Sequence, residues 1–164
     1  MTDSEEQKQS LSQYGKLLVA LSTAGVDYAV VGGLAVIFNG YPRLTLDADI
    51  VVDESPANLE HMLTVLRGWG EGWARELSIS DFTLEEGAVR LGEDFELDIF
   101  TRLRGLGWKD FQPRLRFIDH VSIRIPYLSP EDLIHCKANS VREKDQLDVI
   151  ALKKIIEQQQ ANQP

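Results

Sequence analysis

The chain has little of what disulfide-stabilised, zinc-binding or membrane-spanning proteins require. Its 164 residues include one cysteine, Cys136, so no internal disulfide can form. The three histidines show no His-x-x-x-His or Cys/His spacing, which argues against a structural zinc site. No apolar run reaches the roughly 18 residues that a membrane helix needs. The acidic N-terminus has no basic stretch followed by an apolar core and is not a secretory signal, so we expect a cytoplasmic protein without a membrane partner.

Positive charge is also scarce. There are 17 Lys and Arg residues against 26 Asp and Glu residues, which gives a net charge of -9 at pH 7. Because a broad, sequence-independent grip on nucleic acid is built from Lys and Arg, this balance argues against such a surface and leaves room only for a local basic channel. Most of the basic residues in the second half are interpreted as solvated surface charges: Arg102, Arg104, Lys109, Arg114, Arg116 and Arg124.

The pattern of apolar residues, glycines and prolines predicts one domain over residues 1–164, with residues 1–8 and 158–164 frayed. We predict helices over residues 5–24, 34–39, 55–67, from 129 onward and 140–157. We predict strands over residues 28–31, 44–52, 88–91, 95–101, 114–119 and 121–126. This order of helices and strands predicts an α/β (α+β) fold with a mixed sheet.

The most informative residues are two aspartates in the strand predicted over 44–52. Side chains alternate across a strand, so Asp47 and Asp49 point to the same face. Two carboxylates side by side repel each other, and strands disfavour Asp, so the pair indicates a cation between them more strongly than a solvated strand face. A hard divalent ion such as Mg²⁺ takes carboxylate oxygens and commonly binds substrate phosphates as well.

A glycine pair and two polar residues precede these aspartates. Gly32 and Gly33 would let backbone N–H groups approach a phosphate closely, although a tight strand-to-helix turn would need glycine too. Arg43 could bind a phosphate with its planar guanidinium, or it could be an exposed loop residue that follows Pro42.

Together these residues resemble the nucleotidyltransferase superfamily of the DNA polymerase β type, and within it small bacterial members that include the AbiEii-like toxins. The likeness rests on Gly32-Gly33, Arg43, Thr45, Asp47-Ala48-Asp49, Glu96-Leu97-Asp98-Ile99, and near the C-terminus Lys137, Arg142 and Lys144-Asp145-Gln146-Leu147-Asp148. The resemblance implies a nucleotidyltransferase-like mixed sheet backed by helices, with C-terminal helices packed beside it.

The resemblance also implies roles for individual residues. Asp47, Asp49 and Asp98 would hold the metal, Mg²⁺ or Mn²⁺, and Asp98 could act as general base on the acceptor hydroxyl, with Glu96 as its rival. The nucleotide would be bound at Gly32, Gly33, Arg43, Thr45 and Lys137.

The activity implied is transfer of a nucleoside monophosphate from an NTP to a hydroxyl acceptor, with release of pyrophosphate. The acceptor could be an RNA end such as that of tRNA, a protein hydroxyl or a small molecule. The likeness to AbiEii-like proteins implies a toxin of a toxin–antitoxin pair, with an antitoxin as a partner.

One departure from the family pattern favours an alternative. Many relatives have Ser at the second position of the glycine pair, where its hydroxyl contacts phosphate, but this chain has Gly33. Arg43 or Thr45 could compensate, or the fold could serve as a non-catalytic nucleotide-binding or partner-binding module. Asp145 and Asp148 share one face of the last helix, where we expect them to anchor Arg or Lys side chains rather than a metal.

Overall fold

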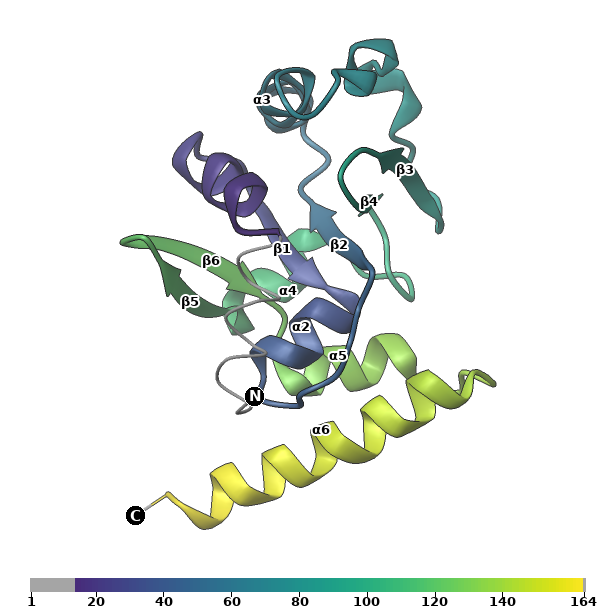
Figure 1. The fold of residues 1–164 in the computed structure, drawn as a ribbon. Helices are drawn as coiled ribbons and strands as arrows, with labels where there is room; N and C mark the ends of the chain where they lie inside the picture. The colour runs from purple at the N-terminus through teal and green to yellow at the C-terminus, as the bar shows by residue number, and fades with distance from the viewer. Residues whose placement is uncertain (1–13, 164) are drawn as a thin grey trace.

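A six-stranded mixed sheet forms the centre of the computed structural model, which describes residues 14–163 (Figure 1). Its strands are β1 (Tyr28–Val31), β2 (Asp47–Val52), β3 (Ala88–Gly92), β4 (Glu96–Phe100), β5 (Arg116–His120) and β6 (Ile123–Tyr127), in the order β3-β4-β2-β1-β6-β5. β2 pairs with β4 and β1 with β6 in parallel, and the other three pairs are antiparallel. The predicted α/β (α+β) fold with a mixed sheet is confirmed.

Helices cover the sheet and extend beyond it. Residues 14–23 are helical, and they are followed by α2 (Gly32–Phe38), α3 (Pro56–Arg67), α4 (Trp108–Phe111), α5 (Pro130–Lys137) and α6 (Glu143–Ala161). α5 lies between α2 and the long α6, so the predicted C-terminal helices pack beside the sheet (Figure 1). Within residues 14–163, none of the helices combines the length and the apolar character needed to span a bilayer.

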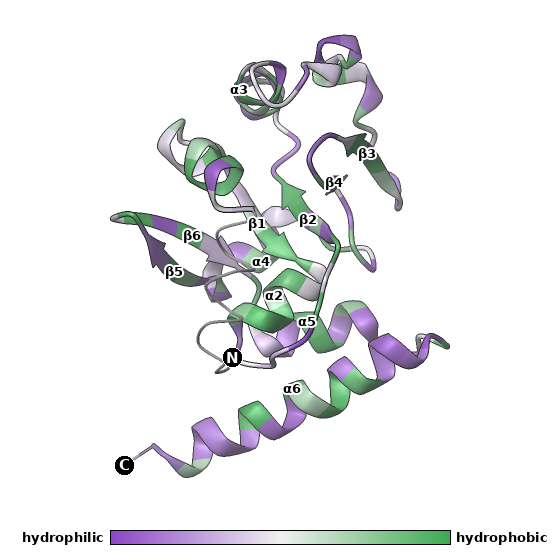
Figure 2. Ribbon diagram, viewed as in Figure 1, coloured by the Kyte–Doolittle hydropathy of each residue, from purple (hydrophilic) through white to green (hydrophobic). Residues whose placement is uncertain are grey.

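The core follows the predicted apolar pattern. All four residues of β1 are buried, because this central strand is covered on both faces. The inward face of α3 is Leu59, Met62, Leu63 and Leu66, and each is buried. Figure 2 shows the resulting apolar centre at β1, β2 and α2, whereas α6 is largely hydrophilic.

Two elements at the site differ from the prediction. α2 begins at Gly32 rather than at residue 34, so the glycine pair forms the first helical turn, with Gly32 in the left-handed region at φ 63°. β2 begins at Asp47 rather than at residue 44, because its partner β4 begins at Glu96, directly opposite Asp47. The preceding residues have no partner strand, and Leu44 is 88% exposed.

The chain ends also differ. α6 begins after Arg142, because the hydroxyl of Ser140 donates to the side chain of Asp145 at 2.7 Å instead of capping a helix that starts at Ser140. α6 continues to Ala161, past the predicted end at 157 and into the segment predicted to fray, since Gln and Ala are good helix formers. Residues 5–13 of the first predicted helix and the predicted frayed residues 1–8 lie outside the described residues.

We predict that Asn58→Ala destabilises the fold by about 3 kcal/mol, at roughly 1 kcal/mol for each of three lost hydrogen bonds. The buried Asn58 side chain accepts from the Asp27 N–H at 2.7 Å and donates to the carbonyls of Asp27 at 3.0 Å and Asp53 at 2.8 Å. Urea unfolding measures the change. The exposed α6 variant Gln160→Ala is the control, and equal stability of the two variants would contradict the prediction.

Candidate active site

Acidic side chains gather on one face of the sheet because β2 and β4 run parallel and in register. Asp47 lies opposite Glu96, and Asp49 lies opposite Asp98. The residues that alternate with them, such as Ala48, face the core. The two strands therefore place four carboxylates side by side, which neither strand could do alone.

A single cavity of about 220 Å³ collects every residue that the sequence predicts for the site. The predicted residues that line it are Gly32, Gly33, Arg43, Thr45, Asp47, Asp49, Asp98 and Lys137. The wall is completed by Arg90, Phe100, Arg142, Lys144 and Asp145. Residues more than 100 positions apart in the sequence thus share one polar site.

The pKa of the Asp49 carboxyl is raised by its surroundings in this cavity. Burial, and after it the neighbouring carboxylates of Asp98 and Asp47, together raise its pKa from 3.8 to about 7. Lys137 lowers the pKa but does not offset these effects. A cation between Asp47 and Asp49 would relieve this repulsion.

Two of the three predicted aspartates, Asp47 and Asp49, fit a divalent metal in this structure, and the third, Asp98, does not join them. Among residues 14–163, no set of three or more His, Cys, Asp and Glu side chains is placed to hold a metal ion together. Both oxygens of Asp98 are bonded to Arg90, at 2.7 Å from Nε and 3.1 Å from Nη2. Asp47 and Asp49 are left as hard oxygen donors, which suits Mg²⁺, since this ion is commonly bound by one or two carboxylates plus substrate phosphates.

Two cations of the cavity wall are held by one buried carboxylate of α6. The Asp148 side chain, 1% exposed, accepts a hydrogen bond from Arg43 Nη2 at 3.0 Å and lies 3.1 Å from Lys137 Nζ. Lys137 also donates to Asp145 at 2.9 Å, and Arg142 lies 3.5 Å from the same carboxylate. The prediction that Asp145 and Asp148 anchor basic side chains is confirmed.

Close approach disfavours a side chain at both glycines, and the positive φ of Gly32 adds a conformational requirement at that position. A Cβ at Gly32 would lie 2.0 Å from the Asp49 Oδ2. A Cβ at Gly33 would lie 2.5 Å from the Arg43 Nη2 and 3.1 Å from the Thr45 Oγ1. The space that a serine would need at position 33 is therefore occupied by the Arg43 guanidinium and the Thr45 hydroxyl.

Two hydrogen bonds hold the segment that contains Arg43 and Thr45 in place. The buried Tyr14 hydroxyl donates to the Thr45 carbonyl at 2.9 Å, and the Thr45 hydroxyl donates to the Asp47 carbonyl at 3.1 Å. Burial, and secondarily Asp47 and Asp49, raises the pKa of Tyr14, so this hydroxyl stays a donor. These bonds keep an otherwise irregular segment in place beside the cavity.

Arg90 is the site residue that the sequence argument missed. It lies on β3, directly across the antiparallel ladder from Asp98. The signal was present, because counting back from Asp98 across the predicted turn at residues 92–94 leads to Arg90.

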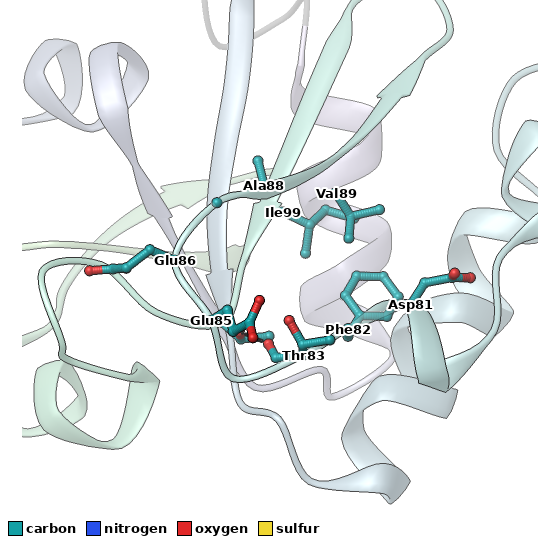
Figure 3. Close-up of a pocket in the computed structure, with 10 residues that line it drawn as sticks. Asp81, Phe82, Thr83, Glu85, Glu86, Ala88, Val89 and Ile99 are labelled. Atoms are coloured by element: carbon teal, nitrogen blue, oxygen red, sulfur yellow. Dashed lines mark hydrogen bonds between the residues drawn. The ribbon is translucent and has the colours of Figure 1, made fainter.

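Two further cavities are present, one beside the site and one on the opposite face of the sheet. One of about 200 Å³ shares Gly32, Asp49 and Lys137 with it but is largely apolar, with Leu103 and Leu133 in its wall. The other is lined by Phe82, Val89 and Ile99 together with acidic side chains (Figure 3). Because Val89 and Ile99 alternate with Arg90 and Asp98 on the same strands, this cavity belongs to the opposite face of the sheet.

Comparison with known proteins gives a consistent result. The family model described as "Nucleotidyltransferase of unknown function (DUF6036)" matches residues 11–161. Among curated proteins, no sequence matches.

Solved structures share the fold. The lincosamide antibiotic adenylyltransferase LnuA, with lincomycin bound, is 19% identical with a TM-score of 0.60, over 88% of this chain and 96% of that one. The candidate nucleotidyltransferase TM1012 of Thermotoga maritima is 16% identical with a TM-score of 0.57, over 95% of both chains. An antigenic nucleotidyltransferase-like protein of Paracoccidioides brasiliensis is 18% identical with a TM-score of 0.55, over 93% of this chain and 77% of that one.

We expect Gly33→Ser to destabilise the protein by about 1–3 kcal/mol, because the new side chain must displace a guanidinium that Asp148 holds. Chemical denaturation measures the cost. Gly92→Ser is the matched control, since nothing lies within 4 Å of a Cβ at Gly92. The cost should shrink when Arg43→Ala is combined with Gly33→Ser, and an undiminished cost in the double variant would show that Arg43 is not the obstacle.

A second prediction concerns pH. Protonation of Asp49 stabilises the folded state fully below the ordinary pKa of 3.8, and this stabilisation is lost as the pH rises through the folded pKa of about 7. Asp49→Asn should therefore be more stable than the wild type at pH 8, by a margin that shrinks as the pH falls toward 4. Unfolding curves in EDTA test this, with Asp119→Asn on the exposed β5 as the charge control. A margin that does not change with pH would refute it.

Proposed function

The chain belongs to the nucleotidyltransferase family DUF6036, and from this premise we propose that it transfers a nucleoside monophosphate from an NTP to a hydroxyl acceptor with the help of Mg²⁺ or Mn²⁺. The observation that carries the proposal is the composition of the cavity wall. Paired carboxylates on β2 lie across one small cavity from cations that α6 holds in place. This is the distribution of charge that a metal-bound triphosphate requires.

The residues of the cavity divide the work. Asp47 and Asp49 would hold the metal, which when bound would neutralise charge on the phosphate oxygens. Arg43 and Lys137, fixed by their ion pairs, would face those oxygens, and Arg43 would supply the donor that Gly33 lacks. The backbone at Gly32 and Gly33 would approach the phosphates closely.

The proposed reaction needs only the NTP and the acceptor hydroxyl as reactants. The acceptor oxygen forms a bond to the α-phosphorus, and the bond from that phosphorus to the departing pyrophosphate breaks. The hydroxyl proton passes to Asp98, which lies beside Asp49 in the parallel ladder. Glu96, its rival, lies beside Asp47 and is exposed, so its position suits this role less well.

For the acceptor we favour a small hydroxylated molecule. The net charge of -9 disfavours a nucleic-acid acceptor, and two of the basic residues in the second half are paired with carboxylates, Arg102 with Glu54 at 3.2 Å and Arg114 with Asp132 at 2.9 Å. The apolar cavity that adjoins Asp49 would suit the body of a small acceptor. LnuA, which shares the fold, is an adenylyltransferase of lincosamide antibiotics.

Two other readings make different predictions for the same site. A toxin of a toxin–antitoxin pair, as the AbiEii-like resemblance implies, would modify tRNA or a protein and be neutralised by an antitoxin. A non-catalytic module would bind nucleotide without releasing pyrophosphate, and Gly33 is the residue that favours it.

Pyrophosphate release tests the proposal. Purified protein is incubated with each NTP and Mg²⁺ or Mn²⁺, and with tRNA, a protein mixture or hydroxylated antibiotics such as lincosamides and aminoglycosides as acceptors. We expect release with a small-molecule acceptor, and a loss of about a hundredfold or more in the Asp47→Asn, Asp49→Asn double variant. Asp119→Asn, which removes a charge on exposed β5, should behave as the wild type.

The pattern of results separates the readings. Release with tRNA or protein alone would favour the toxin. Nucleotide binding in calorimetry, with no more release than the double variant shows in any arm, would favour the non-catalytic module and overturn the transferase proposal.

A further inference from the structure

We propose that Arg90 is a positioning residue that competes with the metal ion for the carboxylate of Asp98, and so sets the metal affinity of the free protein. This inference rests on the proposed function, since it concerns the metal of that site. The Arg90 guanidinium donates to both oxygens of Asp98, at 2.7 Å and 3.1 Å, which is the fork-like geometry of a strong arginine–carboxylate pair.

The sheet places Asp98 between two opposite influences. Arg90 on β3 lies across the antiparallel ladder from it, and Asp49 on β2 lies across the parallel ladder on the other side. One neighbour is a cation and the other a carboxylate, so Asp98 is drawn to Arg90. This explains why the three aspartates line one cavity and yet, among the described residues, form no three-membered metal site.

The two partners differ in their freedom to move. The Asp98 side chain is 10% exposed, whereas the Arg90 side chain is 60% exposed. Arg90 can therefore move into solvent once the pair is broken, while Asp98 stays on the face of the sheet. Arg90 also has a second ion-pair partner, because its Nη1 lies 3.5 Å from the exposed Glu96 carboxylate.

A metal ion must displace Arg90 to take the carboxylate lone pairs of Asp98 to which the guanidinium donates. The free protein accordingly binds metal weakly, through Asp47 and Asp49, and gains Asp98 only when Arg90 has moved. A triphosphate in the cavity favours this exchange, because its oxygens offer the displaced guanidinium a new partner. Arg90 thereby links metal binding to the arrival of the nucleotide.

The test measures Mn²⁺ affinity without nucleotide, by electron paramagnetic resonance of free Mn²⁺. Arg90→Lys keeps the positive charge but loses the two-pronged contact, so it isolates competition from simple electrostatics. We expect Arg90→Lys to bind Mn²⁺ several-fold more tightly than the wild type, and Arg90→Ala about tenfold or more, the effect of losing one charge-assisted pair. Arg67→Ala, which removes the exposed ion pair with Glu60 on α3, is the matched control and should leave the affinity unchanged.

The same Arg90 substitution in an Asp98→Asn protein tests whether the effect acts through Asp98. With Asp98→Asn in place, Arg90→Lys should no longer change the Mn²⁺ affinity, since the carboxylate for which the two compete is gone. An affinity of Arg90→Lys equal to that of the wild type, or a gain that persists in Asp98→Asn, would overturn the role of Arg90 and leave the proposed function standing. Absence of Mn²⁺ binding in every variant, with or without NTP, would overturn both.

Discussion

The candidate site depends on one buried carboxylate, Asp148. It is fully buried on α6 and forms ion pairs with Arg43, from the segment before β2, and with Lys137, from α5. Charges leave water at a high cost, so a buried carboxylate is stable only while its partners stay with it. The ion pairs of Asp148 therefore hold together α6, α5 and the segment before β2. The same contacts place Arg43 and Lys137 at the cavity wall.

The charge balance of the cavity follows from this arrangement. Arg43, Lys137 and Arg142 pair with carboxylates of α6 and Arg90 pairs with Asp98 of β4, whereas within residues 14–163 neither Asp47 nor Asp49 forms an ion pair. Burial, together with repulsion from Asp98 and Asp47, raises the pKa of Asp49 to about 7. The folded protein thus holds acid groups in a state that a metal ion would stabilise, close to cations that a phosphate would need.

Much of the fold could be read from local patterns. A short continuous apolar run located β1, the turn residues 92–94 located the β3–β4 hairpin, and Ser-Pro pairs located the starts of α3 and α5. The errors lie where partners decide the boundaries. β2 is shorter than predicted because its parallel partner β4 begins opposite Asp47, and α6 starts later because Ser140 bonds to Asp145. Such limits depend on a second segment, which a local pattern does not contain.

The site shows the same division. By itself, the sequence determined that Asp47 and Asp49 share a strand face and that a glycine pair precedes them, because alternation and backbone freedom are local properties. Only the tertiary structure decided that Arg43 fills the space beside Gly33 and that Arg90 takes both oxygens of Asp98. Those contacts join segments far apart in the chain or across a ladder, and their distances exist only once the sheet and α6 have assembled.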